Sequence, residues 1–453
     1  MLPVVTVAEM RAADAAAPVP EETLVRRAGT AIAVAAMKML GSAYGARVVV
    51  VAGKGNNGAD GRVAAAVLTR RGARVRVIGA EPVPPGCHLV IDAALGTGLR
   101  RPYTAPDVPA GARVLAVDIP SGIDGDTGAA RGTPMHASRT VTFAAWKPGL
   151  LQGDGPRFAG EVEVADIGLG PIDAAISLVE DDDVVRLVPR REEASHKWAT
   201  AVCVVAGSPG MEGAATLCAR GASRAGAGMV RLGVPGAGTG AGPWPTEAVR
   251  LDLSAQTGWA EDVLRALERC KVLVIGPGIG RSDATQREVR RVLSRSPVPV
   301  IADADALFAL GDAGAAREVL ARAPAVIVTP HDGEYARLLG EGPGTDRVAA
   351  ARRLATALGV TALVKGSLTA VASPSDRVML SSAGSSRLAT AGTGDVLSGV
   401  IGACVARGMP PLEAAAVAAH LHGRAASDGR AEGLVATDLP RLVSARLSRA
   451  LRG

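Results

Sequence analysis

Residues 389–399 have the sequence ATAGTGDVLSG, a loop of small residues that opens directly onto an apolar, helix-like stretch. Main-chain N–H groups in such a turn can surround a phosphoryl group, and the start of the helix adds a positive partial charge. The acid that ends the loop, Asp395, could deprotonate a hydroxyl group that attacks the phosphoryl group. A plain glycine-rich helix start is the alternative. The segments around the loop favour a phosphate site on an α/β fold.

Three upstream segments supply that context. Each is an apolar run followed by a glycine-rich or polar turn: residues 274–280 (VIGPGIG), 326–334 (VIVTPHDGE) and 364–369 (VKGSLT). The second places His331 and Glu334 just beyond a strand, and the third places a lysine there. A lone histidine is more often structural, but between an anion-binding turn and a glycine-rich loop His331 is predicted to contact a ligand.

The first half of the chain carries a similar set of turns. Residues 53–61 (GKGNNGADG), 92–99 (DAALGTGL) and 118–124 (DIPSGID) each follow a predicted strand. Because ligands gather at the carboxyl ends of parallel strands, two acids and several polar loop groups should meet at one sheet edge. Oxygen ligands of this kind suit a hard cation. Each turn alone is weak evidence, since an Asp at a strand end often only caps the next helix.

Short β-branched runs alternate with Ala-rich helical segments along the whole chain, which predicts parallel sheets between helix layers. The acidic, irregular stretch between Ile172 and Glu193 is the best boundary, giving domains 1–185 and 190–453. The expected fold is α/β, with two three-layer αβα domains. The predicted strands are Val48–Ala52, Val75–Ile78, His88–Ile91, Val114–Val117, Thr140–Phe143, Ala201–Ala206, Met229–Val234, Val272–Ile275, Val298–Ile301, Ala325–Val328, Ala362–Val364 and Thr369–Ala372.

Composition narrows the class of protein. The formal charge of +6 is spread over helix-like segments, and aromatic residues make up only 2% of the chain, so nucleic-acid binding is not expected. The excess positive charge is more consistent with a modest attraction for polyphosphate ligands. Five cysteines without a C-x-x-C pair predict neither a disulfide framework nor a zinc site. No stretch is apolar enough to cross a membrane, and the N-terminus lacks a signal peptide, so we expect a cytoplasmic protein.

The first-half segments resemble the N-terminal epimerase domain of the NAD(P)H-hydrate repair enzymes. The matching patterns are GNNGGDG, D-A-x-x-G-T-G, D-I-P-S-G-x-D and T-F-x-x-x-K-P-G, the last at residues 142–149. The resemblance implies a Rossmann-like domain in which Asn57, Asp92 and Ser121 hold K⁺. It also implies that the substrate contacts Asn56, Asn57, Gly58, Ala59, Asp60, Gly96, Thr97, Gly98, Leu99, Arg100, Arg101, Pro102 and Asp118.

Two residues of this half carry specific expectations. Asp118 is the candidate acid/base for interconverting two epimers, with Lys147 as a possible electrostatic partner; a surface lysine is the alternative for Lys147. Ala59 departs from the second glycine of the G-G-D step. If that position has a positive φ, Ala there costs about 1 kcal/mol and weakens the epimerase assignment.

The second half resembles ribokinase-like enzymes, and within them the ADP-dependent dehydratase domain of the same repair enzymes. The matches include His196-Lys197, G-P-G-x-G, residues 303–307 (DADAL), T-P-H-x-x-E, K-G-x-x-T, A-G-T-G-D, and His420 and His422. Trp198-Ala199-Thr200 replaces an expected glycine pair, and the roles of Asp303 and Asp305 stay open. The resemblance implies Mg²⁺ and an ADP site at Lys365, Gly366, Ser367, Leu368, Thr369, Thr390, Ala391, Gly392, Thr393 and Gly394.

The same resemblance places the hydrated nicotinamide against Ala214, Gly278, His331 and the catalytic Asp395. The implied function is repair of hydrated NADH and NADPH (NADHX and NADPHX): epimerisation of the R and S forms, then ADP-dependent dehydration of the S form with release of AMP and phosphate. A homo-oligomer is expected. The alternatives are a vitamin or sugar kinase in the second half and a non-catalytic binding module in the first.

Overall fold

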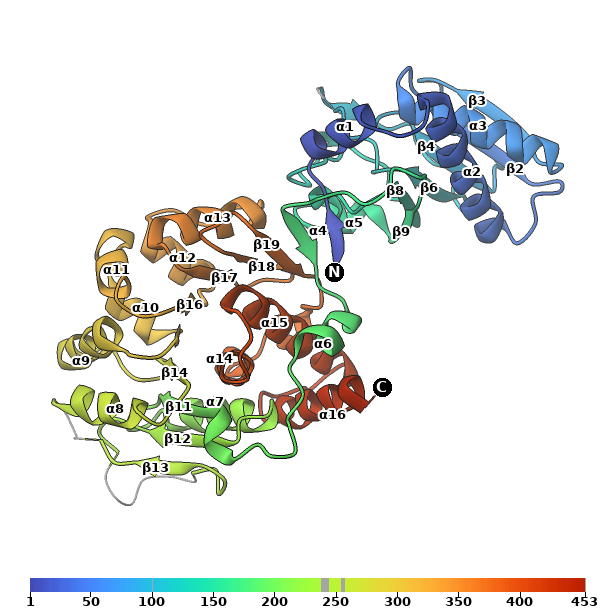
Figure 1. Cartoon of the computed structure of the whole chain (residues 1–453). Coiled ribbons are helices and arrows are strands. Elements are labelled where there is room, and N and C mark those ends of the chain that lie inside the picture. Colours follow the sequence, from blue (N-terminus) through green and yellow to red (C-terminus); the bar gives the residue numbers. More distant parts are fainter. Residues whose placement is uncertain (100, 238–243, 254–256, 453) are drawn as a thin grey trace. The chain divides into compact units, whose positions relative to one another are not determined.

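The computed structural model describes residues 1–99, 101–237, 244–253 and 257–452 (Figure 1). The chain forms two compact units, one of residues Leu2–Ile176 and one of Ser177–Gly453 together with Met1. Each unit is an α/β domain with its own sheet, which confirms the predicted fold class. Among the described residues, no helix has both the length and the apolar character needed to span a membrane.

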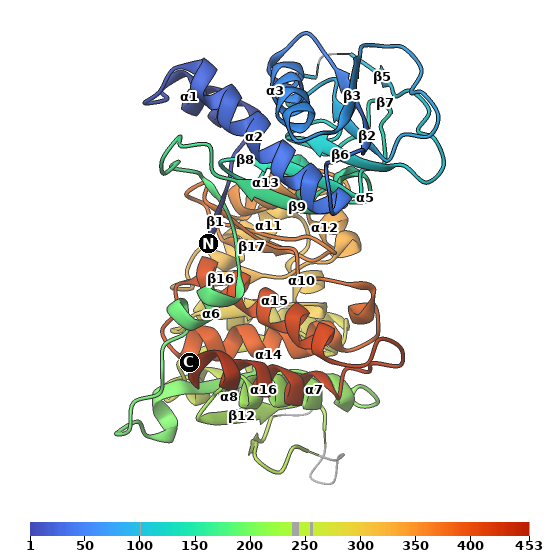
Figure 2. The same cartoon turned by 90° about the vertical axis from the view of Figure 1, so that its right-hand side faces the viewer.

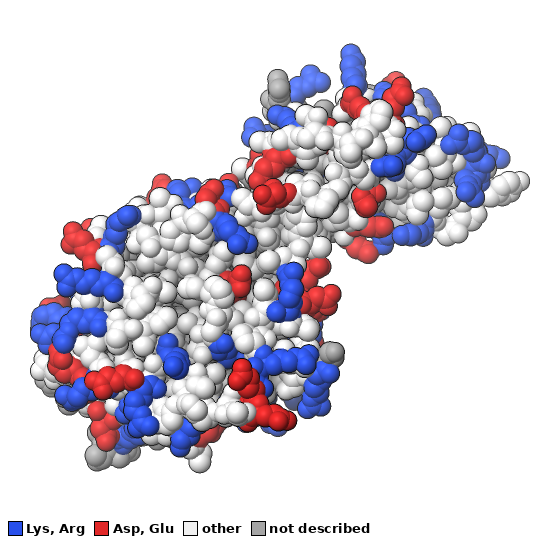
Figure 3. Space-filling view, viewed as in Figure 1, with Lys and Arg blue, Asp and Glu red and all other residues white. Residues whose placement is uncertain are grey.

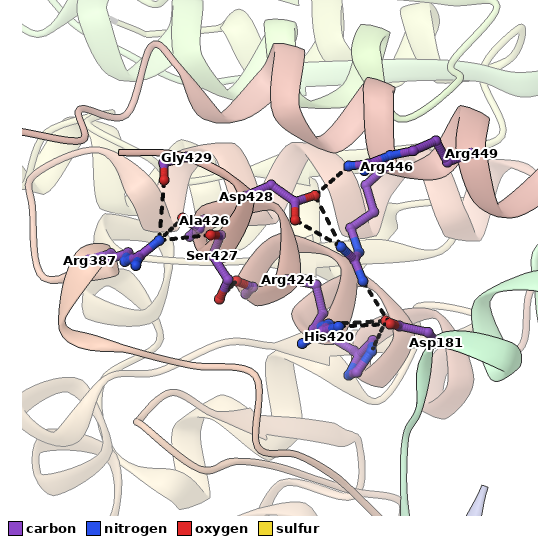
Figure 4. Close-up of polar contacts among 11 residues, drawn as sticks. Asp181, Arg387, His420, Arg424, Ala426, Ser427, Asp428, Gly429, Arg446 and Arg449 are labelled. Atoms are coloured by element: carbon purple, nitrogen blue, oxygen red, sulfur yellow. Dashed lines mark hydrogen bonds and ion pairs between the residues drawn. The ribbon is translucent and has the colours of Figure 1, made fainter. Parts of the chain in front are cut away.

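The division between the units precedes helix α6 (Asp181–Leu187), so the predicted domain end at residue 185 falls inside an element of the second unit. Asp181 accepts hydrogen bonds from His420 and Arg424 of α15 (Pro411–Asp428) and from Arg446 of α16 (Leu439–Arg452), at 3.0, 2.9 and 2.7 Å (Figure 4). Figure 4 also shows Arg446 reaching Asp428 at the end of α15. The observed division thus lies within the predicted boundary stretch Ile172 to Glu193, but the acidic run in that stretch forms a helix held by ion pairs.

The first unit is built on a parallel sheet of six strands in the order β3-β2-β4-β6-β8-β9. The strands of this unit are β1 (Leu2–Val4), β2 (Arg47–Ala52), β3 (Arg74–Ile78), β4 (Leu89–Ala93), β5 (Tyr103–Thr104), β6 (Arg113–Val117), β7 (Gly132–Thr133), β8 (Arg139–Phe143) and β9 (Glu161–Ala165). The helices are α1 (Val7–Ala15), α2 (Glu21–Leu40), α3 (Asn56–Arg70), α4 (Pro148–Leu151) and α5 (Gly155–Ala159).

Strand β2 explains how this unit folds. Four consecutive valines, residues 48–51, are all buried, because a central strand of a parallel sheet is covered on both faces. Ala64 and Leu68 of α3 pack with Ile32 and Ala36 of α2 in the same core. Gly61 of α3 lies so near the sheet that a Cβ atom there would be 2.6 Å from Ala93 Cβ. These contacts fix the first turn of α3 above the carboxyl end of β2.

The second unit contains a mixed sheet whose strands follow the order β10-β19-β18-β17-β16-β15-β14-β11-β12-β13. They are β10 (Ile176–Leu178), β11 (Ala201–Val205), β12 (Met229–Gly233), β13 (Val249–Leu251), β14 (Val272–Ile275), β15 (Val300–Ala302), β16 (Val326–Val328), β17 (Thr361–Val364), β18 (Thr369–Ala372) and β19 (Val378–Ser381). The ladder from β13 to β17 is parallel, and β17, β18 and β19 pair antiparallel.

Helices cover both faces of this sheet (Figures 1 and 2). One face carries α7 (Glu212–Arg224), α14 (Thr393–Ala406), α15 and α16; the other carries α8 (Trp259–Leu267), α9 (Asp283–Arg295), α10 (Asp305–Leu310), α11 (Ala313–Leu320), α12 (Asp332–Leu339) and α13 (Arg347–Leu358), and two short 3₁₀ turns lie at Lys197–Thr200 and Ser386–Leu388. Small residues let α14 pack closely on α7: a Cβ atom at Gly399 would lie 2.0 Å from Cys218 O. This packing holds the start of α14 at the carboxyl ends of the strands.

Candidate active sites

A cavity of about 1260 Å³ opens at the carboxyl edge of the first sheet. The loops after β2 and β4 and the ends of β6 and β8 line it, as the sequence predicted. Of the predicted substrate residues, the cavity wall contains Asn56, Asn57, Asp60, Gly96, Thr97, Gly98, Arg101, Pro102 and Asp118. Gly58, Ala59 and Leu99 do not line it, and Arg100 lies outside the described residues.

Gly58 and Ala59 have structural roles in the loop after β2. A Cβ atom at Gly58 would lie 2.0 Å from Gly53 O, so this position requires glycine for the close approach of two main chains. Ala59 lies in the first turns of α3 and is not among the positive-φ residues. The strain that the sequence analysis considered for Ala59 is therefore absent.

Asp118 and Lys147 form a buried ion pair at the cavity wall. Lys147 Nζ lies 2.8 Å from Asp118 Oδ1, and the lysine side chain is only 1% exposed. Thr142 Oγ1 donates to Asp118 Oδ1 at 2.9 Å, and Lys147 Nζ also donates to Phe143 O at 2.8 Å. Asp118 has a φ of +65°, which is uncommon for a residue with a side chain. Lys147 is therefore not a surface lysine, and the pairing expected for it is present.

Two further carboxyl groups face this pair from α3 and α1. Asp60 is 5% exposed, and burial, followed by repulsion from Asp118 and Asp14, raises its pKa to about 8. No ion pair or side-chain hydrogen bond reaches Asp60 from the described residues. Burial also raises the pKa of Asp14, partly offset by the Lys147 charge. With one ammonium group for three carboxyl groups, Asp60 holds a proton near neutral pH while Asp118 is ion-paired.

The three predicted potassium ligands meet in one network. Asp92 is fully buried, and its Oδ1 and Oδ2 accept from Ser121 Oγ at 2.6 Å and Ser121 N at 2.9 Å. Asn57 Nδ2 donates to Val117 O at 2.7 Å. Burial raises the pKa of Asp92, and a bound cation would favour the charged form. The oxygens of these three side chains and of nearby main-chain carbonyls are the ligands that a hard monovalent cation prefers.

Tyr103 is a cavity residue that the sequence analysis missed. Its hydroxyl group is buried with no hydrogen-bond partner in the described chain, and burial together with the Asp92 charge raises its pKa. Apart from its position directly after Pro102, no sequence pattern indicates this role for Tyr103.

Helix α1 also contributes unpredicted residues, since Met10, Arg11 and Asp14 line the cavity. The helix begins with a capping box between Thr6 and Glu9, a T-x-x-E pattern visible in the sequence. That pattern predicts a helix start but not which sheet edge the helix covers. The contribution of α1 therefore required the structure.

In the second unit, the small-residue loop that begins at Ala389 leads into α14, as predicted. Gly392 has a φ of +90° and is the N-cap, and Thr393 Oγ1 donates to Leu388 O at 2.9 Å, which fixes the turn. Asp395 lies in the first turn of the helix. Burial, followed by repulsion from Asp303, raises its pKa to about 7, despite the nearby Lys365. A carboxyl group of this kind can accept a proton near neutral pH.

Asp303, whose role the sequence left open, anchors the lysine of the predicted nucleotide site. Lys365 Nζ lies 2.7 Å from Asp303 Oδ1, and Ser398 Oγ donates to Asp303 Oδ2 at 2.6 Å. Burial alone would raise the pKa of Asp303, but the Lys365 charge and these hydrogen bonds lower it overall. The Asp303 carboxylate therefore links β15, β17 and α14.

Asp305 has a different function in the fold. Its Oδ1 lies 2.6 Å from Arg281 Nε, and its Oδ2 accepts from Gly280 N at 3.0 Å. It therefore orders the G-P-G-x-G loop. In that loop Gly278 faces the start of α7, because a Cβ atom at Gly278 would lie 2.9 Å from Ala214 Cβ. The two predicted substrate residues Ala214 and Gly278 are thus neighbours.

His331 caps a helix. Its Nδ1 accepts from Gly333 N at 3.0 Å, and Glu334 Oε2 accepts from His331 N at 2.9 Å, a reciprocal cap at the start of α12. The ring is 62% exposed, and its Nε2 lies 3.4 Å from Glu334 Oε1. Burial raises the pKa of Glu334, although the Lys365 charge lowers it in part.

The predicted ADP residues differ in exposure. Gly366, Ser367 and Ala391 are exposed, Lys365, Thr390, Gly392 and Gly394 are half-buried, and Leu368, Thr369 and Thr393 are buried. Thr369 Oγ1 donates to Gly366 O at 3.3 Å. The turn after Lys365 packs against Gly384, where a Cβ atom would lie 2.6 Å from Ser367 O. Any contact from residues 368 and 369 would come from the main chain.

The two helix histidines are both buried but differ in environment. His420 binds Asp181, whereas Nε2 of His422 has no partner among the described residues. Burial lowers the pKa of His422 to about 4, so its ring is neutral beneath the loop that begins α14. Neither histidine is placed as a proton donor at neutral pH.

These two units define a two-domain α/β enzyme: one domain with a carboxylate-lined cavity, the other with a glycine loop at the start of a buried helix. Residues 202–449 match the family model described as NAD(P)H-hydrate dehydratase, and residues 21–86 and 80–149 match that described as YjeF-related protein N-terminus. The ADP/ATP-dependent NAD(P)H-hydrate dehydratase from Bacillus subtilis, co-crystallized with ATP/Mg²⁺, is 28% identical, with a TM-score of 0.52 over 60% of this chain and 98% of that chain.

Relatives cover both domains. The bifunctional NAD(P)H-hydrate repair enzyme Nnr of Salinibacter ruber is 35% identical over 99% of this chain and 98% of its own length. That of Mycobacterium tuberculosis is 38% identical over 90% of each chain. The chain belongs to the family of bifunctional NAD(P)H-hydrate repair enzymes.

Proposed function

We propose that this chain repairs hydrated NADH and NADPH, interconverting the R and S hydrates in its first unit and dehydrating the S hydrate with ADP in its second. Family membership over nearly the whole chain carries this proposal. It is supported by the ion-paired Asp118 in the first cavity and by Asp395 at the start of α14. A homo-oligomer remains a prediction.

Epimerisation needs an acid to protonate the hydroxyl group that leaves and a base to accept a proton from the water that replaces it. In the proposed step, Asp60 donates a proton to the hydroxyl at ring carbon six, the C–O bond breaks, and the ring nitrogen lone pair forms the C=N bond of an iminium ion. Water then adds to the opposite face as Asp118 accepts its proton. Return of that proton to Asp60 through water completes the cycle. Lys147 Nζ, 2.8 Å from Asp118 Oδ1, holds the Asp118 carboxyl group in place.

The potassium site would lie beside this chemistry. The side-chain oxygens of Asn57, Asp92 and Ser121 suit K⁺. Because Asp92 is buried and its pKa is raised, a bound cation would stabilise its carboxylate form. When bound, the ion would supply positive charge to the loop that contains Gly96 and Thr97. The three ligands hold that loop against the end of β6, since Leu95 N donates to Ser121 Oγ at 2.8 Å.

Dehydration uses the second unit. Asp395 takes the proton of the S-hydrate hydroxyl, whose oxygen attacks the β-phosphorus of ADP, and AMP leaves. Phosphate then leaves ring carbon six with the electrons of the C–O bond, and a proton is lost from carbon five, which restores the dihydropyridine. Main-chain N–H groups at Gly392–Gly394 and the Lys365 charge would stabilise the transferring group.

Magnesium would accompany the nucleotide. Mg²⁺ is commonly held by phosphate oxygens and one or two carboxylates. Glu334 is the acid suited to this position, because its carboxyl group is fixed by His331 N and lies near the Lys365 charge. The ion would neutralise charge on the phosphoryl group during transfer.

The full chain, supplied with a mixture of R and S hydrates and ADP, tests the function. We expect the complete mixture to return to reduced nicotinamide, with release of stoichiometric AMP and phosphate. Nuclear magnetic resonance can follow the reaction. Accumulation of a phosphorylated vitamin or sugar with ATP, and no hydrate turnover, would contradict the proposal. If R hydrate remained unreacted at the end, the first unit would bind the hydrate without epimerising it.

A further inference from the structure

The cavity of the first unit is larger than a hydrated nicotinamide ring requires. Its volume of about 1260 Å³ exceeds the range of roughly 300–1000 Å³ common for small-molecule sites. Its wall carries the carboxyl groups and Lys147 described above. The wall also carries three further basic residues, Arg11, Lys54 and Arg101. The cavity therefore has room and charge for a ligand portion beyond the reacting ring.

Arg11 is positioned by α1. Val7 N donates to Asp126 Oδ1 at 2.7 Å, and the capping box at Thr6 fixes the first turn, so the helix is tied to the loop after β6. A Cβ atom at Gly98 would lie 3.9 Å from an Arg11 terminal nitrogen. The guanidinium group therefore lies over the G-T-G loop, where glycine leaves the main chain open to a ligand.

Lys54 and Arg101 complete the basic set. Lys54 immediately precedes the N-cap Gly55 of α3, a helix without acidic residues in its first turn, so the positive partial charge of the helix start is not neutralised there. Arg101 follows the G-T-G loop and lines the same cavity. Within residues 1–99 and the other described ranges, none of the three cations has an ion pair or a side-chain hydrogen bond.

Some exposed arginines of the described chain, Arg26 and Arg70 among them, likewise have no ion pair, so the position of Arg11, Lys54 and Arg101 at the cavity wall is what distinguishes them. On the face in Figure 3, Lys and Arg side chains are interspersed with Asp and Glu, and neither sign covers a unit. Many of the surface arginines have an acidic partner, as Arg139 does in Glu161 and Arg131 in Asp124. Arg11, Lys54 and Arg101 lack such a partner and face a ligand-sized space.

We propose that Arg11, with Lys54 and Arg101, binds the diphosphate of the dinucleotide in the epimerase cavity, and that Arg11 is a determinant of dinucleotide affinity. This rests on the proposed function of the first unit. Guanidinium groups form charge-assisted, bidentate hydrogen bonds with phosphate oxygens.

The test measures exchange between R and S hydrates by the full chain without ADP or ATP, so that dehydration does not contribute. Arg11→Ala should raise KM for hydrated NADH and hydrated NADPH equally, by roughly tenfold, the effect of losing one charge-assisted hydrogen bond, with little change in kcat. The wild-type KM should rise with salt, and this dependence should weaken in the variant. Arg11→Lys should lie between the two.

Arg26→Ala is the matched control, since Arg26 is exposed on α2 and does not line the cavity. Its KM should equal that of the wild type, and both variants should keep the wild-type unfolding temperature. An effect of Arg11→Ala on hydrated NADPH alone would assign Arg11 to the 2′-phosphate and overturn the proposal. An unchanged KM, or a loss confined to kcat, would also overturn it. Absence of exchange in the wild-type chain would instead contradict the epimerase function.

Discussion

Lys365 Nζ lies 2.7 Å from Asp303 Oδ1, so the ammonium group of the predicted nucleotide site is paired with Asp303 rather than with Asp395. Ser398 Oγ holds the other oxygen of Asp303 at 2.6 Å. Repulsion from this carboxylate adds to burial and raises the pKa of Asp395 to about 7. Asp303 therefore positions Lys365 and also raises the pKa of the proposed base, Asp395.

The first prediction concerns the pH dependence of dehydration. Asp395 must be ionised to accept a proton, and its raised pKa of about 7 means that the rate should rise with pH through neutrality and level off above it. Asp303→Asn removes a negative neighbour, so the rise should move to lower pH. Rates of dehydration of purified S hydrate across pH measure the shift. An unmoved pH profile in a folded Asp303→Asn enzyme would contradict the assignment.

Asp303→Asn should also lower stability. The substitution leaves the Lys365 ammonium group, largely enclosed, without its counter-charge, and breaking a buried pair costs about 3 kcal/mol. Denaturant unfolding of the second unit measures the loss. Asp303→Asn with Lys365→Met should recover part of it, because no unpaired charge then remains.

The second prediction concerns epimerisation, which needs Asp60 protonated. With a pKa of about 8, the exchange rate should fall as pH rises above that value. Asp14→Asn removes one of the charges that raise the pKa of Asp60, so the fall should begin at lower pH. Asp60→Asn should slow exchange by roughly 10²–10⁴-fold, the usual contribution of a general acid. Asp173→Asn, an exposed control outside the cavity, should match the wild type.

The third prediction concerns the Asp118–Lys147 pair. Lys147→Met leaves Asp118 with an uncompensated charge in a nearly closed environment and should destabilise the first unit by about 3–5 kcal/mol. Thermal unfolding of the full chain should show an early transition for this unit, with dehydration of S hydrate retained at low temperature. A single, unchanged transition would show that the pair contributes little.

The fourth prediction concerns Ala59. Because Ala59 lies in α3 with ordinary helical geometry, Ala59→Gly should leave the exchange rate unchanged and lower stability by about 0.5–1 kcal/mol. Exchange kinetics and denaturant unfolding test both parts. A faster Ala59→Gly enzyme would mean that the methyl group hinders substrate.

Much of the fold could be predicted from the sequence because buried parallel strands are continuous β-branched runs. Val48–Ala52 and Val272–Ile275, for example, appear as β2 and β14 within one residue. Two edge strands, β9 and β13, were missed, although the edge strand β3 was predicted as Val75–Ile78. β9 (Glu161–Ala165) alternates charged and apolar residues over only five positions, and β13 is three residues long, so neither gives a strong pattern.

The sites were predicted unevenly for a related reason. Glycine turns and acids at strand ends made Asp118 and Asp395 candidates, because these patterns are visible in the local sequence. The burial of Lys147, the link from Asp303 to Lys365 and the approach of Arg11 to Gly98 depend on residues distant in the sequence. Likewise, the sequence of the acidic run at Asp181 does not indicate its ion-pair partners on α15 and α16 (Figure 4).

The most direct measurement compares Asp395→Asn, Asp118→Asn and the exposed control Asp283→Asn on a mixture of hydrated NADH epimers with ADP, following the return of reduced-nicotinamide absorbance. Asp283→Asn should restore the whole mixture. Asp395→Asn should restore none of it, and Asp118→Asn should consume the S form while the R form persists, beyond its slow spontaneous exchange. Restoration by Asp395→Asn at the rate of the control would contradict the account.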